Sequence, residues 1–167
     1  MIIEDLLVWP DRRSLAAMPE ADALAEVDAL LEAALLDVRF DATTSSAWLL
    51  FDCRGAVQLE MGNTAVVVVR GVTGLQWHAD PRPGRVWRAV MGWQPVSGAG
   101  LFSCTVELSP GSRLEVSGVA AEFYVGDIPG GDDAPPNFMT ASDKEIRAGL
   151  AAWSSDFEVV HASFTDD

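Results

Sequence analysis

Apolar side chains recur at helical spacing between residues 20 and 36. They form one stripe, made of Leu24, Val27, Leu30, Leu31, Ala34 and Leu35. The opposite side carries the acids Asp22, Glu26, Asp28 and Glu32. Pro19 suits a first helical turn, where a missing N–H is tolerated. The pattern predicts an amphipathic helix over 20–36 with a solvated acidic face.

From residue 38 onward the period changes to that of strands. Residues 48–51 form a continuous apolar run, which indicates a strand buried on both faces. Apolar and polar residues then alternate over 57–61, and Gly62-Asn63 is a typical two-residue hairpin turn. This turn leads into residues 64–69, whose β-branched side chains give the strongest strand signal in the chain.

The remaining patterns predict further strands and a second helix. Strands are expected over 72–78, 86–93, 102–108, 113–117 and 157–164, and residues 121–125 either extend the strand over 113–117 or form another one. Pro110-Gly111 is expected to close a hairpin, and residues 95–100 are expected to form a loop. Ser142 and Glu145 have the spacing of a capping box, which predicts a short helix near the C-terminus.

Together these elements predict an α+β fold. Consecutive strands joined by short turns pair as antiparallel neighbours, so we expect one curved, mostly antiparallel sheet of about seven to nine strands. The helix over 20–36 would pack on one face of that sheet. No repeat or linker divides the sequence, so residues 1–167 are expected to form a single domain.

The charge of the chain restricts its partners. Its net charge is −14, from 25 acidic and 11 basic residues. Such a surface repels phosphate backbones and anionic lipid headgroups, so we expect neither nucleic acid nor a membrane as partner. The N-terminus lacks the basic segment of a signal peptide, and no apolar run approaches the ~20 residues of a membrane helix. These features predict a cytoplasmic protein.

Common catalytic and cofactor-binding motifs do not occur in the sequence. We find no phosphate loop, no dinucleotide fingerprint, no nucleophile elbow and no zinc-protease motif. His78 and Asp80 are two potential metal ligands, and His161 is a distant third, whereas a closed zinc site needs four ligands. We therefore expect no catalytic residue, no metal site and no cofactor.

The two cysteines, Cys53 and Cys104, have two interpretations. Arg54 follows Cys53, and a nearby guanidinium favours a reactive thiolate. A lone cysteine on a strand is more typical of a small buried hydrophobe, which is the interpretation we prefer. Two cysteines are too few for a disulfide framework, and we expect no disulfide between them.

Tryptophans and arginines alternate between residues 77 and 93. The residues are Trp77, Arg82, Arg85, Trp87, Arg88 and Trp93. Large aromatic side chains usually pack a core, and we prefer that interpretation. The combination of tryptophan and arginine is also typical of surfaces on which bases or sugars stack, and of hot spots, the few residues that carry most of the binding energy of a protein interface.

The leading functional hypothesis is a non-catalytic protein-binding module for a basic partner, as the immunity partner of a toxin would be. The predicted partner-binding residues are Asp127, Asp132 and Asp133, with Phe138 as an aromatic anchor. The hypothesis requires at least two of the acidic segments at 20–36, 127–133 and beyond residue 156 to share one face, so that their fields add.

Two alternatives stay open. The first is a small-molecule-binding domain with an apolar pocket between the sheet and its helices. The second is an enzyme that uses a carboxylate as acid and base, for which Glu122, beside Phe123 and Tyr124, is the candidate. Homo-oligomerisation is compatible with all three hypotheses and is not readable from the sequence.

Overall fold

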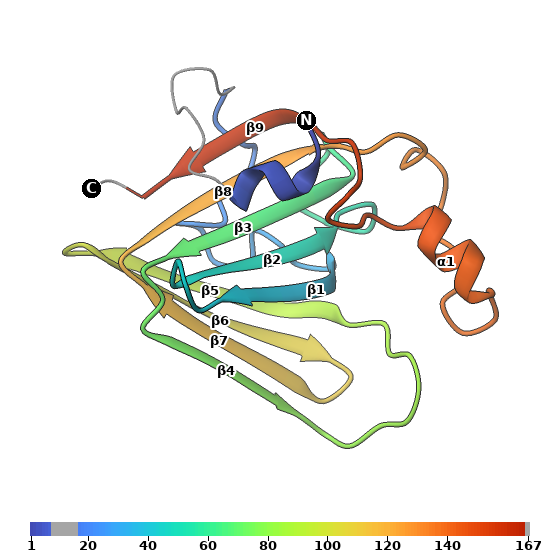
Figure 1. The fold of residues 1–167 in the computed structure, drawn as a ribbon, viewed down its shortest axis with the longest axis horizontal. Coiled ribbons are helices and arrows are strands. Elements are labelled where there is room, and N and C mark those ends of the chain that lie inside the picture. The colour runs from blue at the N-terminus through green and yellow to red at the C-terminus, as the bar shows by residue number, and fades with distance from the viewer. Residues whose placement is uncertain (8–16, 166–167) are drawn as a thin grey trace.

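The computed structural model describes residues 1–7 and 17–165 (Figure 1). Its strands are β1 (Ala34–Asp41), β2 (Ser46–Asp52), β3 (Thr64–Arg70), β4 (Gly74–Ala79), β5 (Ala89–Gly98), β6 (Leu101–Ser109), β7 (Ser112–Gly118), β8 (Ala120–Asp127) and β9 (Glu158–Phe164). Its helices are the 3-10 helix η1 (Ile3–Leu7) and the α-helix α1 (Asp143–Gly149). The predicted class, with a mostly antiparallel sheet and few helices, is confirmed.

All nine strands belong to one open sheet. Their order is β4-β7-β6-β5-β1-β2-β3-β8-β9, and every neighbouring pair is antiparallel. The join between β5 and β1 is narrow, because Ala34 and Ala89 are the residues that pair there. Within the described residues, the edge strands β4 and β9 do not pair with each other. The curved form that we predicted for the sheet is not confirmed.

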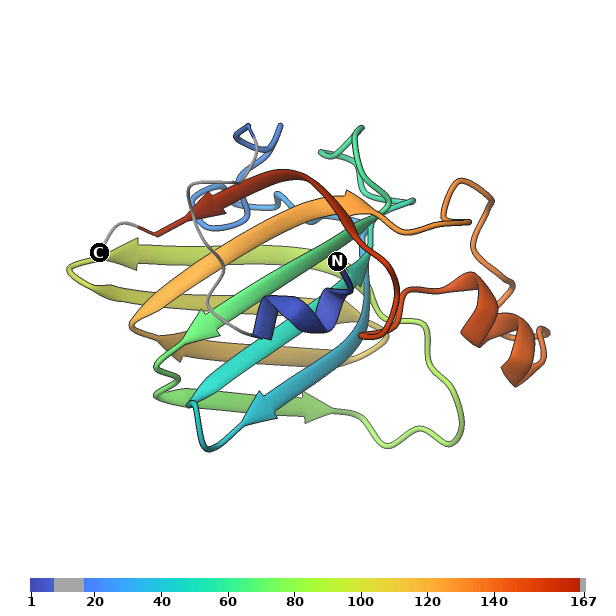
Figure 2. The same ribbon diagram turned by 45° about the horizontal axis from the view of Figure 1, so that its top comes forward.

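Two apolar clusters lie on opposite faces of the central strands. Because successive side chains of a strand alternate between faces, β2 places Leu49 and Phe51 in the first cluster and Trp48 and Leu50 in the second. The first cluster also contains side chains from β5, β6 and β7. It therefore connects the strands on the two sides of the narrow join between β5 and β1. The second cluster is covered by η1, which lies across the face of the sheet (Figure 2).

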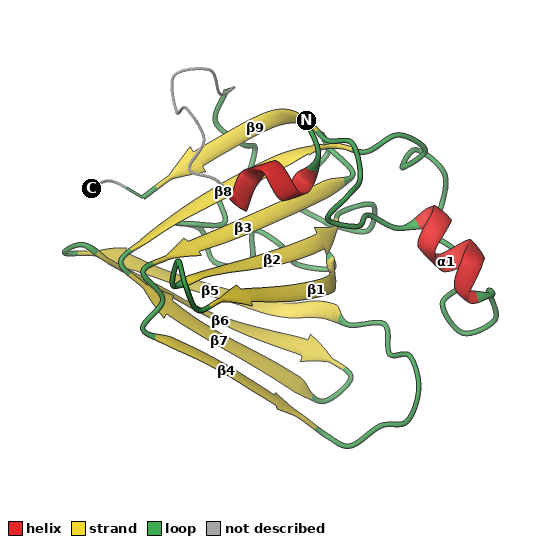
Figure 3. Ribbon diagram, in the orientation of Figure 1, coloured by secondary structure: helices red, strands yellow, loops and turns green. Residues whose placement is uncertain are grey.

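The helix predicted over 20–36 is wrong. Residues 20–33 form a series of turns that contains no helix, and β1 follows directly (Figure 3). Asp28 and Glu32 have φ angles of 60° and 66°, in the left-handed region, which interrupts a right-handed helix. The helical periodicity of the apolar residues therefore does not describe the backbone here.

Hydrogen bonds to β5 replace the helical ones in this segment. The backbone N–H of Asp28 donates to the carbonyl of Trp93 (2.8 Å), and the Asp28 carboxylate accepts the N–H of Trp93 (3.0 Å). The N–H of Glu32 donates to the carbonyl of Val90 (2.9 Å), and the indole N–H of Trp93 donates to the carbonyl of Ala23 (2.8 Å). Tertiary pairing thus overrides local propensity, which is a weak preference.

The connection between β2 and β3 also differs from the prediction. These strands pair as expected, but residues 53–63 form the loop between them. The strand predicted over 57–61 is therefore wrong, and Gly62-Asn63 is the end of a long loop instead of a two-residue turn. Gly62 keeps the positive φ of a turn glycine, at 84°.

The loop predicted over 95–100 is wrong at its start, because β5 continues through Pro95 to Gly98. In this part of the sheet β5 pairs with β6 alone among the described strands. Proline lacks an N–H and is tolerated in a strand where one side has no partner. The strand predicted over 86–93 correspondingly begins later, at Ala89.

The second hairpin and the second helix are confirmed. Residues 110–111 connect β6 to β7, and the two strands pair up to the turn. At α1, the Ser142 hydroxyl accepts the N–H of Glu145 (3.3 Å) and the Glu145 carboxylate accepts the N–H of Ser142 (2.7 Å). Both bonds of the capping box are therefore present. In the described part of the chain, neither the length nor the apolar content of any helix suffices to cross a membrane.

Candidate functional site

The three aspartates predicted to bind a partner line one hollow. They belong to the end of β8 and the segment that follows it, at the end of the sheet from which α1 projects (Figure 1). This hollow is open, has a volume of about 420 Å³ and lies beside the 53–63 loop. A second hollow, of about 460 Å³, shares Asp127 and Asp132 with the first and reaches the start of β9. The acidic side chains that line the two hollows are Glu60, Asp127, Asp132, Asp133, Asp156 and Glu158. We call this group the acidic surface.

The loop at the end of β8, residues 127–133, is called the acidic loop. Asn63 holds it against the loop between β2 and β3. Its side-chain oxygen accepts the N–H of Ile128 (3.0 Å), and its amide donates to the carbonyl of Ile128 (3.3 Å). Its backbone N–H donates to the Asp127 carboxylate (3.1 Å). A Cβ atom on Gly131 would lie 2.2 Å from Nδ2 of Asn63, so a side chain at this position would displace the Asn63 amide.

Arg54 ties the other end of the acidic loop to β2. Its Nε donates to Oδ1 of Asp52 (3.2 Å) and its Nη2 donates to Oδ2, which makes a bidentate ion pair with a side chain that is 4% exposed. Nη1 donates to the carbonyl of Asp133 (2.8 Å), and Nη2 donates to the carbonyl of Gly149 at the end of α1 (2.8 Å). Arg54 therefore fixes the backbone of the loop, while its own charge is balanced by Asp52.

Basic side chains are scarce at the acidic surface. Among the described residues that line the two hollows, Arg54 is the sole basic side chain. Exposed apolar groups occur near the acids: Met1 lines the second hollow at 53% exposure, and Met61, which is 51% exposed, stands in the chain between Glu60 and Gly62, two residues that line the first hollow. From the acidic segment at 20–36, Glu20 reaches this region, where its carboxylate accepts the N–H of Glu60 (2.6 Å).

Phe138 is not brought to the acidic surface. Its ring is half-buried and packs against Trp87, with 5.5 Å between the ring centroids. The Arg85 guanidinium lies 5.5 Å from the centroid of the Phe138 ring and also donates to the carbonyl of Ala141 (3.0 Å). Phe138 thus joins the segment before α1 to the segment before β5, which is an internal contact.

Glu122, the candidate acid of the enzyme hypothesis, lies in a closed polar cluster. Its carboxylate accepts from Nε of Arg70 (3.0 Å), from Nη2 of Arg70 (3.3 Å) and from the hydroxyl of Tyr124 (2.6 Å). Arg70 also donates to the carbonyls of Leu6 and Leu7, which fastens η1 to the sheet. Because Glu122 is 1% exposed and both its oxygens are engaged, it has no access to a substrate in this structure.

Both cysteines are buried thiols. Burial raises the pKa of Cys53 well above its ordinary value, and the negative charge of Asp52 raises it further. Burial likewise raises the pKa of Cys104. The neighbouring Arg54 does not favour a Cys53 thiolate as we had considered, because its charge is paired with Asp52.

The histidines and tryptophans singled out in the sequence are dispersed. His78 is exposed and contacts Gln76 at 3.5 Å, and no cluster of three potential metal ligands occurs in the described residues. Trp93 is fully buried, as the core interpretation predicts, and Trp87 is half-buried against Phe138. Trp77 is 45% exposed and carries the Arg88 guanidinium 4.9 Å from its ring centroid.

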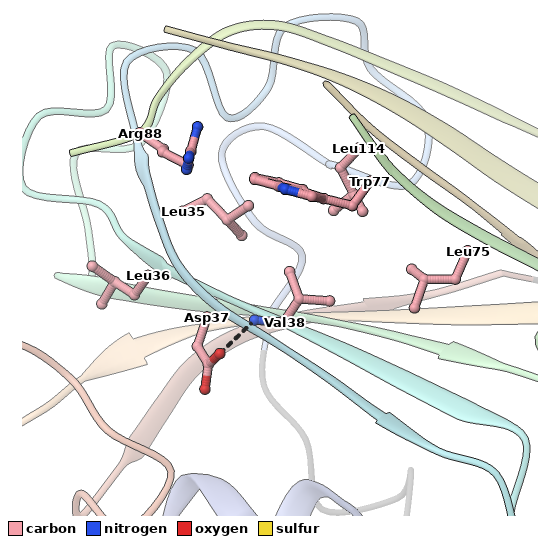
Figure 4. Close-up of a pocket in the computed structure, with 8 residues that line it drawn as sticks. All are labelled: Leu35, Leu36, Asp37, Val38, Leu75, Trp77, Arg88 and Leu114. Atoms are coloured by element: carbon pink, nitrogen blue, oxygen red, sulfur yellow. Dashed lines mark hydrogen bonds between the residues drawn. The ribbon is translucent and has the colours of Figure 1, made fainter. Parts of the chain in front are cut away.

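An apolar pocket is present, in a different place from the one we predicted. It lies between β1 and the strands β4 and β7, and not between the sheet and a helix (Figure 4). The periodicity of the sequence gave no signal for it, because its walls come from strands that are distant in the chain.

Comparisons with known proteins add no function. No family model matches the chain, and no curated protein matches it significantly. Among solved structures, the chain is similar to an uncharacterized protein from Neisseria gonorrhoeae, with a TM-score of 0.42 and 10% sequence identity. That similarity covers 56% of this chain and 90% of the other one. A likeness of this extent carries no argument about function.

Proposed function

We propose that this protein is a non-catalytic binding module that recognises a basic partner protein through the acidic surface. The observation that carries the proposal is the meeting of two acidic segments, one after β8 and one at the start of β9, around hollows that share Asp127 and Asp132. Carboxylates that share one surface add their fields, and such a field attracts a cationic partner and speeds its association.

The acidic surface is held in place before any partner arrives. Asn63 and Arg54 fix the loop through hydrogen bonds to its backbone, a half-buried one at Ile128 and an exposed one at Asp133. A loop that is already ordered loses less conformational entropy on binding. The carboxylates of Asp132 and Asp133 have no described ion-pair partner, so they are available to the lysines or arginines of another protein.

Charge alone contributes mainly to the rate of association, and affinity needs an apolar contact. Met1 and Met61, both about half exposed, provide flexible apolar side chains at the border of the acidic surface. Methionine adapts its shape to irregular partners. A partner that places an apolar residue among its basic ones fits this arrangement best.

The proposal is tested by comparing two charge variants as baits. The first neutralises the acidic surface by the changes Asp132→Asn, Asp133→Asn, Asp156→Asn and Glu158→Gln. The control removes the same number of charges at other exposed positions, by Glu26→Gln, Asp80→Asn, Glu107→Gln and Asp143→Asn. Each bait is incubated with lysate of the source organism near physiological salt, and captured proteins are identified by mass spectrometry.

The expected result is a basic protein captured by the wild type and by the control variant but lost with the neutralised acidic surface. The proposal is rejected if capture is equally reduced in both variants, because overall charge and not this surface is then responsible. It is also rejected if the captured protein is acidic, or if the neutralised variant captures it as well as the wild type does.

A further inference from the structure

The pocket between β1 and the β4–β7 pair is a second potential binding site, separate from the acidic surface. Its volume is about 310 Å³, and it is open on one side. Apolar side chains make up most of its walls: Leu35 and Val38 from β1, Leu75 and Trp77 from β4, and Leu114 from β7 (Figure 4). Trp77 belongs to the exposed half of edge strand β4, so its ring is accessible to a ligand.

Arg88 supplies the positive charge of this pocket. Its Nη1 donates to the hydroxyl of Ser112 (2.6 Å) and to the carbonyl of Pro110 (3.5 Å). No carboxylate of the described residues forms an ion pair with it, and its Nε and Nη2 have no described acceptor. In a chain with 25 acids and 11 bases, a half-buried arginine without an acidic partner is an unusual placement.

The nearest acid in the lining does not neutralise Arg88. Figure 4 shows Asp37 on the side of β1 away from Arg88, Leu35 and Val38. The Asp37 carboxylate accepts the indole N–H of Trp153 (2.6 Å) and the backbone N–H of Val38 (2.9 Å). The pocket therefore combines an apolar interior with one guanidinium whose free N–H groups suit a carboxylate.

Arg88 is also held in a position in which it can bind a carboxylate. Its guanidinium stacks over the Trp77 ring at 4.9 Å, and its backbone carbonyl accepts the N–H of Leu35 (2.9 Å) at the join between β5 and β1. Both contacts reduce the conformational freedom that would otherwise be lost on binding. A carboxylate held by Arg88 leaves the apolar body of the same molecule against Trp77 and the leucines.

We propose that this pocket binds a small amphipathic carboxylate whose apolar body has about the size of two fused rings. The size follows from the volume, since a dry apolar cavity of about 150 Å³ holds benzene and this pocket has about twice that volume. The charge follows from Arg88. This site takes a different ligand class from the acidic surface, and neither proposal depends on the other.

Isothermal titration with three probes of one shape tests the proposal. The probes are 2-naphthoate, its neutral analogue 2-naphthamide, and the cation 2-naphthylmethylamine. We expect 2-naphthoate to bind once per chain with a Kd on the order of 0.1 mM, as ligands of this size commonly do. The amide should bind about tenfold more weakly, because it forms no ion pair with a guanidinium, and the amine more weakly still, because its positive charge is repelled.

Three variants locate the site. Arg88→Gln should weaken 2-naphthoate about tenfold and leave the amide unchanged. Leu75→Trp should fill the pocket and abolish binding of all three probes while retaining Arg88. Arg113→Gln, on the exposed surface of β7, is the matched control and should change nothing, because Arg113 is paired with Glu107 and Glu115 away from the pocket. Circular dichroism and thermal unfolding establish that each variant is folded.

The outcomes are decisive in both directions. Preference for the anion, lost with Arg88→Gln and not with Arg113→Gln, supports the proposal. Equal affinity for anion, amide and amine, or no saturable binding of 2-naphthoate at millimolar concentration, overturns it. Binding that survives Leu75→Trp in a folded protein also overturns it, because the probe then occupies another place.

Discussion

The buried cluster of Arg70, Glu122 and Tyr124 leads to a sharp stability prediction for Glu122→Gln. The substitution keeps the shape of the side chain and removes its negative charge. The buried charge of Arg70, whose side chain is 9% exposed, then loses the Glu122 carboxylate. Breaking a buried ion pair on one side costs about 3–5 kcal/mol, because the remaining charge loses the partner that offset its burial.

The structure places the expected value at the lower end of that range. Arg70 keeps the carbonyls of Leu6 (3.0 Å) and Leu7 (3.1 Å) as acceptors, which partly replace the lost partner. The amide of the new glutamine still offers one oxygen to either Arg70 or Tyr124. We therefore expect Glu122→Gln to lower the free energy of unfolding by about 3 kcal/mol.

Urea unfolding at constant temperature measures this change, and two further variants calibrate it. Tyr124→Phe removes one hydrogen bond to a charged acceptor and should cost about 1.5 kcal/mol. Glu4→Gln removes the exposed ion pair with Arg39, whose side chains are 46% and 39% exposed, and should cost under about 1 kcal/mol. A loss below about 1 kcal/mol for Glu122→Gln, or a loss equal to that of Glu4→Gln, would refute the reasoning.

Three further predictions follow from single positions. Gly126→Ala should lower the free energy of unfolding in urea by about 1–3 kcal/mol, because the new Cβ would lie 2.2 Å from the carbonyl oxygen of Glu158. Gly92→Ala is the control: its new Cβ would lie 3.6 Å from the nearest atom, and the free energy of unfolding should change by less than about 0.5 kcal/mol. Both cysteines should react with a thiol reagent only after unfolding, since burial holds the pKa of each thiol high; fast labelling of the native protein would contradict this. Hydrogen bonds from Ser142 lower the pKa of Glu145, so the capping box should be intact above the ordinary glutamate pKa of about 4.5 and be lost as pH falls through the lower folded value, which amide chemical shifts at Ser142 would follow.

The strands were predictable where local chemistry is strong. The apolar run in β2 and the β-branched run in β3 are buried on both faces, as such runs indicate. The capping box at Ser142 was readable because both of its hydrogen bonds lie within four residues. These signals depend on neighbours in sequence, and they survive in the fold.

The segment before β1 was not predictable, because its partners are distant. Leu24 and Leu30 are buried as their spacing suggests, but Val27 is 65% exposed, since the backbone turns to pair with β5. A helix and a folded-back chain of turns both bury some of the apolar residues in this segment, and the sequence alone does not distinguish them. The positive φ angles of Asp28 and Glu32 were not predicted, because neither residue is a glycine.

The candidate sites, like the fold, were predictable from the sequence only where the signal is local. The aspartates of the loop after β8 could be singled out from composition, but their meeting with Asp156 and Glu158 depends on the pairing of β8 with β9. The contacts by which Arg54, paired with Asp52, fixes the acidic loop could not be predicted from the sequence, because they join the end of β2 to carbonyls that lie far along the chain. Arg88 was visible in the sequence as one of several arginines among tryptophans, and the missing acidic partner became apparent in the structure.

The central claim is that the acidic surface attracts a basic protein. The most direct measurement is the association rate constant between the wild type and its captured partner, by stopped-flow or surface plasmon resonance, at about 20 mM and about 150 mM salt. The account predicts a fall of about tenfold or more between these conditions, and a slow, nearly salt-independent association for the variant with Asp132, Asp133, Asp156 and Glu158 neutralised. A rate constant that ignores salt, or that is the same for the wild type and the neutralised variant, would contradict it.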